Sequence, residues 1–255
     1  MDQNRRAGAR EDIVIGRNAV LELLRSGKAA DSILLQKGLG GTLLKIAAIA
    51  REKGIVVKEV SIAKLDGMCA RANHQGVIAV TAGASYSELE DIFAKAGDNP
   101  PLIVIADGIE DPHNLGALIR TAEAAGAHGI IIPKRRSAGL TFAAAKASAG
   151  AVSHIPVVRA VNLASAMDAL KARGLWFYGA DTGGAPWCET QFSGPVCLVV
   201  GSEGGGISRL VKEKCDHIVS IPMYGKVSSL NVSVAAGVIL YEIARQRALC
   251  GGYNG

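Results

Sequence analysis

The C-terminal part of this 255-residue chain is organised around the stretch Ile221-Pro222-Met223-Tyr224-Gly225-Lys226-Val227-Ser228-Ser229-Leu230-Asn231-Val232-Ser233-Val234-Ala235-Ala236. An apolar strand, 217–221, stops at Pro222, and a glycine-containing loop follows. Apolar residues then return at helical spacing, which predicts a helix that continues to about Ala248. The loop is therefore held between two buried elements. Ser229 and Asn231 lie where this helix begins, so their side chains can cap it or present polar atoms to a ligand.

Two apolar strands upstream also end in polar turns. The predicted strand 102–106 leads into Asp107-Gly108-Ile109-Glu110-Asp111-Pro112-His113-Asn114-Leu115-Gly116-Ala117-Leu118-Ile119-Arg120 and a helix. The strand 196–200 opens into Gly201-Ser202-Glu203-Gly204-Gly205-Gly206, a glycine loop with one carboxylate. Carboxyl ends of parallel strands converge on one crevice. The sequence therefore predicts that polar side chains from all three stretches meet there.

The three blocks, in this order and spacing, resemble the motifs of the SpoU family (SPOUT superfamily) of RNA ribose 2′-O-methyltransferases. The resemblance is nearest to the RlmB type, which methylates a guanosine ribose in 23S ribosomal RNA, and it covers essentially the whole chain. It implies S-adenosylmethionine as cofactor, large-subunit ribosomal RNA as partner and a homodimer. For the fold it implies an α/β protein, with a trefoil-knotted parallel-sheet methyltransferase domain and a small N-terminal RNA-binding domain. Pattern alone would predict an ordinary doubly wound sheet, because knots are rare.

The resemblance also implies roles for individual residues. The backbones of three residues should hold the cofactor: Gly201, Ile221 and Leu230. Five side chains should form the catalytic site: Arg120, Asn114, Glu203, Ser229 and Asn231. Simpler alternatives are that Arg120 only pairs with Glu203 and that Asn114 only caps its helix.

Arg120 matches the catalytic arginine of the family. A guanidinium pKa of roughly 12.5 to 13.8 makes deprotonation costly, so a role as general base is disfavoured. We expect electrostatic stabilisation of the developing alkoxide and of a neighbouring phosphate. One departure from the family pattern is Glu110, which adds a negative charge where relatives often have a small or hydroxyl residue.

The N-terminal third predicts a small α/β domain, residues 11–82, followed by a linker at 83–101 and the methyltransferase domain at 102–250. The run Ala72-Asn73-His74-Gln75-Gly76-Val77 matches the pattern of RlmB-type RNA-binding domains. The candidates for RNA contact are Arg17, Lys37, Arg71 and His74. Each alone is more often a solvated surface residue than an RNA contact.

Composition restricts the remaining possibilities. The net charge is +5 with a pI near 9.0, which fits binding to a polyanion. The N-terminus lacks a secretory signal pattern and no apolar run is long enough to span a membrane, so a cytoplasmic protein is expected. The five cysteines form no Cys-x-x-Cys pair and the histidines lack metal-ligand spacing, so no metal is expected.

Two alternatives to methylation of 23S rRNA stay open. One is the same chemistry on transfer RNA, because RNA identity is read by shape and loops outside the catalytic motifs. The other is a non-catalytic RNA-binding or ribosome-assembly protein with the same fold. Loss of Arg120 or of the Ser229-Leu230-Asn231 run would favour the second alternative, and both are present.

Overall fold

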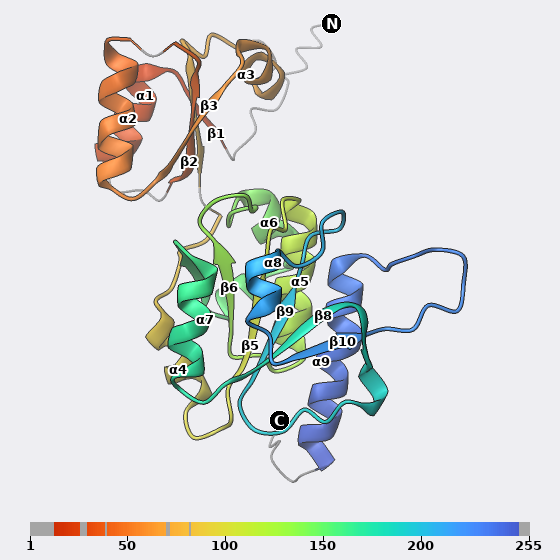
Figure 1. Ribbon diagram of the computed structural model, residues 1–255. Helices are drawn as coiled ribbons and strands as arrows, with labels where there is room; N and C mark the ends of the chain where they lie inside the picture. The colour runs from red at the N-terminus through yellow and green to blue at the C-terminus, as the bar shows by residue number, and fades with distance from the viewer. Residues whose placement is uncertain (1–12, 26–29, 39, 70–71, 82, 250–255) are drawn as a thin grey trace, which may run out of the picture. The chain divides into compact units, whose positions relative to one another are not determined.

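The computed structural model describes residues 13–25, 30–38, 40–69, 72–81 and 83–249 (Figure 1). These residues fall into two compact units. The first lies within Met1–Ser85 with Leu140–Phe142, and the second within Tyr86–Gly139 with Ala143–Gly255. We describe each unit by itself.

A four-stranded sheet forms the centre of the first unit, in the order β1-β4-β2-β3. Strand β2 runs parallel to β3 and antiparallel to β4, and β1 is antiparallel to β4. The elements are β1 (Ile13–Ile15), α1 (Arg17–Arg25), β2 (Ala30–Gln36), α2 (Thr42–Glu52), β3 (Val56–Val60), α3 (Ile62–Met68) and β4 (Val77–Thr81).

Alternation along the strands gives this sheet two buried faces. Ile33 and Leu35 of β2 pack with buried residues of α1 and α2. The intervening Leu34 points to the opposite face and packs with Leu65 of α3 and Ile78 of β4. Helices therefore cover both sides of the sheet (Figure 1).

The second unit contains a six-stranded sheet in the order β10-β8-β9-β5-β6-β7, and every neighbouring pair is parallel. Its strands are β5 (Leu102–Ala106), β6 (Gly129–Pro133), β7 (Val157–Ala160), β8 (Trp176–Pro186), β9 (Val196–Val200) and β10 (His217–Ser220). Its helices are α4 (Leu89–Ala96), α5 (Pro112–Ala124), α6 (Phe142–Ala147), α7 (Leu163–Lys171), α8 (Arg209–Glu213) and α9 (Val232–Leu249), with 3-10 turns at Ala151–Ser153 and Trp187–Glu189.

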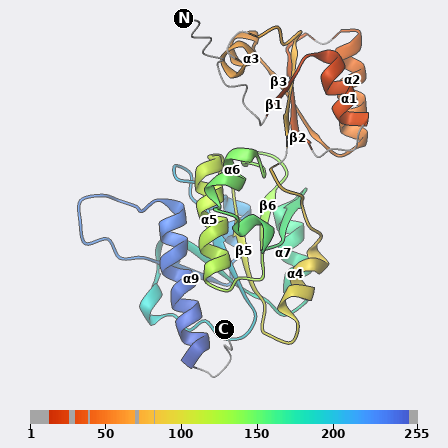
Figure 2. The same cartoon turned by 180° about the vertical axis from the view of Figure 1, so that it is seen from behind.

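Both faces of this sheet are covered, as continuous apolar strands require. On one face, buried residues of α4, α7 and α8 pack on alternate residues of the strands, such as Ile103 and Ile105 of β5. Helices α5 and α9 cover the other face, where they pack against each other (Figure 2). The predicted α/β architecture with a parallel sheet is thus confirmed.

The central pair of strands is a topological switch point. β5 and β9 are neighbours, with Ala106 opposite Val200. The helix that follows β5 lies on one face of the sheet and the helix that follows β9 lies on the other. Such a divergence opens a crevice beyond the carboxyl ends of the two strands.

The sequence pattern predicts a helix at 115–125 and a strand at 176–180, and both elements are longer in the structure. Helix α5 begins at Pro112, three residues before the expected Leu115, because the Asp111 carboxylate accepts a hydrogen bond from the His113 N–H (3.0 Å) and caps the helix. Asn114 therefore lies in the first turn of α5. Strand β8 continues to Pro186, beyond the expected end at Ala180. The segment expected as a linker contains α4, whose Ile92 is fully buried in the core of the second unit.

Candidate functional site

The turn after β5 forms the first wall of the crevice. The Asp107 N–H donates to the Val200 carbonyl (2.8 Å), and the Asp107 carboxylate accepts from the Ser208 N–H (2.8 Å). Gly108 adopts a positive φ of 74°, which only glycine takes up readily. These contacts direct the chain back over the ends of β5 and β9 and into α5.

The glycine loop after β9 forms the second wall. Ser202 and Gly206 exchange two backbone hydrogen bonds, of 3.0 and 2.9 Å, so the loop closes on itself. A Cβ atom added to Gly201 would lie 2.0 Å from the Gly206 carbonyl carbon. Any side chain at Gly201 would therefore open the loop. Glu203 lies at the exposed tip of this loop.

Asn231 connects all three stretches. Its Nδ2 donates to the Asn114 Oδ1 (2.9 Å) and to the Glu203 Oε1 (2.6 Å). Its Oδ1 accepts from the Ser233 N–H (3.0 Å) and so caps α9. The sequence left capping of the helix and presentation of polar atoms to a ligand site as alternatives for Asn231. In the structure its side chain both caps α9 and contacts the other two stretches.

A cavity of about 330 Å³ lies beside this cluster. It is lined by the residues expected to hold a cofactor, Gly201, Ile221 and Leu230, and by Glu203 and Ser229. A second hollow, of about 390 Å³, is lined by Asn114 and Glu203. Glu203 therefore stands between the two spaces.

Arg120 lies outside this cluster. It is six residues after Asn114, which corresponds to roughly 9 Å along the helix axis. Its side chain is exposed and lines neither hollow. Within the described residues no ion pair joins it to Glu203, whose side chain accepts from Asn231. The residue that caps α5 is Asp111. The structure therefore contains neither of the simpler alternatives, in which Arg120 only pairs with Glu203 and Asn114 only caps its helix.

Asp181 and Thr182 also line the cavity of about 330 Å³, and the sequence analysis did not single them out. Both residues follow the apolar part of β8. Their position directly after a buried stretch of strand was the feature of the sequence that could have predicted their place in the site. Burial raises the pKa of Asp181, but hydrogen bonds from Lys212 (2.6 Å) and the Thr182 N–H (2.7 Å) outweigh it and hold the pKa below its usual value. Asp181 is therefore a charged wall of the cavity at neutral pH.

In the first unit, three of the four candidates for RNA contact can be placed, while Arg71 lies outside the described residues. Lys37 is exposed. Arg17 is half-buried, and its backbone N–H and its Nε donate to the Gln75 Oε1 and carbonyl oxygen, both at 3.0 Å. The Nη groups of Arg17 have no partner among the described residues.

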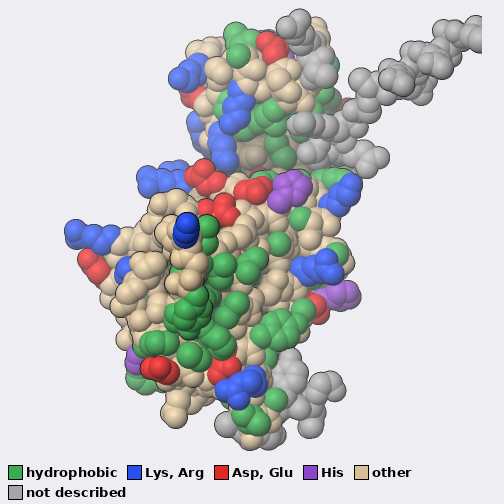
Figure 3. Space-filling model, turned by 90° about the vertical axis from the view of Figure 1, so that its right-hand side faces the viewer, with side chains coloured by type: hydrophobic (Ala, Val, Ile, Leu, Met, Phe, Trp, Pro, Cys, Tyr) green, Lys and Arg blue, Asp and Glu red, His purple; other side chains and the backbone are tan. Residues whose placement is uncertain are grey.

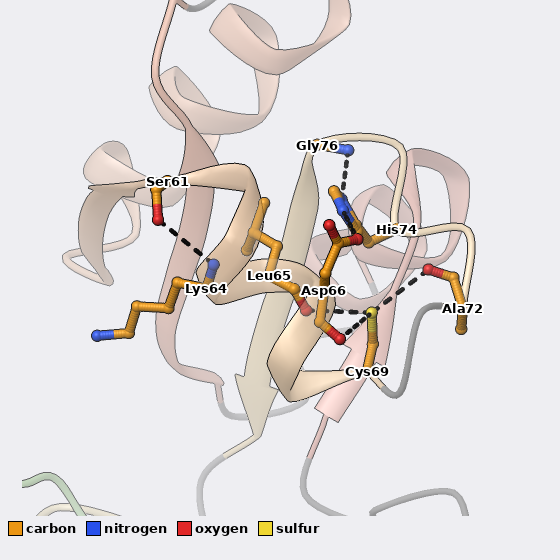
Figure 4. Close-up of polar contacts among 8 residues, drawn as sticks. All are labelled: Ser61, Lys64, Leu65, Asp66, Cys69, Ala72, His74 and Gly76. Carbon is orange, nitrogen blue, oxygen red and sulfur yellow. Dashed lines mark hydrogen bonds and ion pairs between the residues drawn. The ribbon is translucent and has the colours of Figure 1, made fainter.

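His74 occupies a different environment from the one its candidacy implied. It is only 9% exposed. Its Nδ1 accepts from the Gly76 N–H (2.9 Å) and its Nε2 lies 3.1 Å from the Asp66 carboxylate (Figure 4). This arrangement shapes the turn at Gln75 and Gly76, which both have positive φ, and so changes the expected role of His74 from RNA contact to support of the turn.

Other site chemistries receive no support from the described part of the chain. No group of three or more His, Cys, Asp or Glu side chains there could hold a metal ion. Likewise, none of the helices described is both long and apolar enough to cross a membrane.

Comparison with known proteins identifies the family of the chain. Residues 101–241 match the SpoU rRNA methylase family, and residues 13–87 match the RNA 2′-O ribose methyltransferase substrate-binding domain. A putative TrmH family tRNA/rRNA methyltransferase from Bacillus subtilis, YacO, is 46% identical over 240 residues, which cover 92% of this chain and 96% of the relative.

Solved structures give the same result. The SpoU methyltransferase AviRb from Streptomyces viridochromogenes, in complex with the cofactor AdoMet, matches with a TM-score of 0.60 at 27% identity, covering 93% of this chain and 90% of AviRb. An AdoMet-bound rRNA methyltransferase from Sinorhizobium meliloti matches with a TM-score of 0.58 at 28% identity, covering 92% and 87%. The family match spans the β8, β9 and β10 ends that form the cavity, and the chain belongs to the SpoU rRNA methylase family.

Proposed function

We propose that the protein transfers a methyl group from S-adenosylmethionine to the 2′-hydroxyl of a ribose, a guanosine ribose in 23S ribosomal RNA. The observation that carries the proposal is that Asn231 donates hydrogen bonds to both Asn114 and Glu203 beside the cavity, within a chain of the SpoU family. The S. meliloti relative, named as an rRNA methyltransferase, covers both units and supports the choice of rRNA.

The cofactor is S-adenosylmethionine, and the cavity fits its chemistry. Its volume of about 330 Å³ lies within the usual range for small-molecule sites. Apolar side chains such as Leu230 and Ile239 can cover an adenine ring, while the bare backbone at Gly201 leaves room for close approach. The carboxylates of Asp181 and Glu203 suit a ligand with net positive charge.

When bound, the cofactor supplies a methyl group made electrophilic by its sulfonium. The chain's own residues must then place the 2′-hydroxyl in line with this methyl group and stabilise the oxygen as its proton leaves. Asn231 holds the Glu203 carboxylate at the cavity wall and so orients it. We assign Arg120 to stabilising the developing alkoxide and a neighbouring phosphate.

The first unit supplies a surface for substrate choice. A ribose hydroxyl occurs on every nucleotide, so discrimination must come from contacts outside the catalytic pocket. Arg17 and Lys37 are the candidates that reach solvent, and Gln75 fixes the Nε edge of Arg17 while leaving its Nη groups available to phosphate. The trefoil knot expected from the resemblance and the cytoplasmic location expected from the sequence pattern remain predictions.

A homodimer is the assembly that we propose. An apolar stripe follows the exposed side of α9 and the loop before it, and apolar side chains gather on this face of the second unit in Figure 3. Its members are Leu230, Val234, Val238 and Tyr241, of which Val234 and Tyr241 are 53% and 55% exposed. The occupant is a second copy of the chain, because the stripe continues from the cavity-lining Leu230 and would complete the site across the interface.

Sedimentation tests the dimer. Val234→Asp should give a monomer with lost activity, since a charge would be buried in the interface. Leu44→Asp is the matched control, because Leu44 is 52% exposed on α2 of the first unit. A fully active wild-type monomer would refute the assembly.

Mass-spectrometric mapping of ribose methylation in rRNA and tRNA, from cells with and without the gene, tests the reaction. The expected result is one 2′-O-methylguanosine in 23S rRNA that disappears with the gene. A lost methylation in tRNA would establish the alternative substrate. No lost methylation in either RNA would favour the non-catalytic alternative.

A further inference from the structure

Three consecutive cations follow β6 directly: Lys134, Arg135 and Arg136, here called the basic turn. Arg135 and Arg136 are exposed and Lys134 is half-buried. Among the described residues, none of the three side chains has a hydrogen bond, an ion pair or a ring contact. The turn therefore presents three uncompensated positive charges.

Most other cations of the second unit have partners. The ion pairs are Lys171 with Asp216, Arg173 with Glu90, Arg209 with Glu213, Lys212 with Asp181, Lys214 with Asp168, and Arg245 with Glu242. The exceptions among the described side chains are Arg120, Lys146, Lys226 and the basic turn. Only in the basic turn are such unpaired cations consecutive along the described part of this unit.

The backbone around the basic turn is fixed to the catalytic crevice. The Ala138 N–H (2.7 Å) and the Ser137 hydroxyl (3.2 Å) both donate to the Ile109 carbonyl oxygen. The Arg136 carbonyl oxygen lies 3.9 Å from the position of a Cβ on Gly108. Gly108 and Ile109 line the hollow of about 390 Å³ that Glu203 also borders. The three cations therefore adjoin the open side of the site.

Arg136 has a φ of 55°, a left-handed conformation that is strained for residues other than glycine. Strain of this kind persists only where the surroundings hold the backbone, and it is enriched at functional sites. Here the bonds to Ile109 hold the backbone. The fixed backbone of the basic turn therefore fixes the positions from which the charged side chains extend.

The hollow itself cannot hold phosphate by attraction. Its polar lining includes three exposed carboxylates, Glu110, Asp111 and Glu203, which repel an RNA strand. A strand that brings a ribose to this hollow needs cations beside it. We propose that the basic turn binds the phosphates that flank the target ribose, an inference that rests on the proposed RNA methylation.

The test uses the full chain and the combined variant Lys134→Gln, Arg135→Gln, Arg136→Gly. Glycine at Arg136 keeps the left-handed backbone while removing the charge. Arg173→Ala is the matched control, because Arg173 follows α7 near the amino-terminal end of β8. Binding of fluorescein-labelled polyuridylate is measured by anisotropy across salt concentrations, cofactor binding by calorimetry, and methyl transfer on 23S rRNA in parallel.

The expected result for the variant is at least tenfold weaker polyuridylate binding at 0.1 M salt, and a slope of log affinity against log salt smaller by about 2, since each neutralised phosphate of a single strand contributes about 0.7. The KM for rRNA should rise, with cofactor affinity unchanged. Wild-type affinity and slope in the variant would overturn the inference even if methylation occurs. Wild-type protein that binds polyuridylate through the turn but transfers no methyl would instead refute the proposed function.

Discussion

At the residue scale, Asn231 performs two tasks with opposite ends of one amide. Its Oδ1 caps α9, and its Nδ2 donates to Asn114 and Glu203. Asn231→Asp keeps an acceptor for the cap but places an oxygen where the donor was, whereas Asn231→Ala removes both functions.

We expect both substitutions of Asn231 to lower methyl transfer at least tenfold. Only the alanine variant should also lose the cap, which is typically worth about 1 kcal/mol of unfolding free energy. Thermal unfolding and methyl-transfer kinetics separate the two effects. Wild-type turnover in Asn231→Asp would show that the donated hydrogen bonds are not needed.

Arg120 allows a complementary separation. Arg120→Ala should abolish methyl transfer, because the arginine is assigned to stabilising the developing alkoxide. The variant should leave cofactor affinity nearly unchanged, because Arg120 lines neither hollow. Calorimetry with S-adenosylmethionine and single-turnover methylation check this. Loss of cofactor binding in the variant would make Arg120 a structural residue.

At the scale of elements, His128 ties the start of β6 to β5 and makes stability depend on pH. Its Nδ1 accepts from the Leu102 N–H (2.9 Å). Burial, with the nearby charges of Arg247 and Lys95, lowers the pKa of His128 from 6.5 to about 4. The unfolded chain therefore takes up a proton at higher pH than the folded chain.

The stability that neutral His128 contributes should be complete above about pH 6.5 and should be lost as the pH falls towards 4. Thermal unfolding at a series of pH values measures this decline. His128→Asn, which can keep an acceptor for the Leu102 N–H, should have a flatter profile in the same window. An unchanged profile would mean that other groups cause the decline.

The sequence predicted the bounds of helices and strands better than it predicted which residues contact one another. The pattern predicts helices at 62–68 and 89–96 and a strand at 196–200. The bounds of α3, α4 and β9 agree with these ranges, because their apolar residues are bordered by clear capping and turn signals. The extension of β8 was missed because its last residues are small and polar, and their pairing with β10 depends on a bulge between Ile218 and Val219. The burial of His74 was missed because it depends on a side-chain contact with Asp66 of α3, which apolar periodicity does not predict.

At the scale of the whole molecule, we expect the two units to separate the choice of substrate from the reaction. A chain that begins at Ala84 retains α4 and the second core, so it should fold, dimerise and bind the cofactor. It should lose most methylation of large-subunit rRNA fragments, because the contacts of the first unit are gone. Comparison of full-length and truncated chains by rRNA methylation measures the loss.

A truncated chain that methylates the same nucleotide at full rate would mean that the first unit does not select the substrate. In the full chain, Arg17→Ala should weaken RNA binding and reduce its salt dependence without changing cofactor affinity. The two experiments distinguish a unit that only adds affinity from one that selects the nucleotide.

The cavity walls come from segments that lie far apart along the chain: the end of β8, the glycine loop after β9, and the stretch from β10 into α9. A ligand that contacts all three acts as a removable cross-link. By mass action, cofactor at a hundred times its dissociation constant should add about 2.7 kcal/mol to the free energy of unfolding. Supply of the cofactor would then govern how long the folded protein resists proteolysis, even when no RNA is present to be modified.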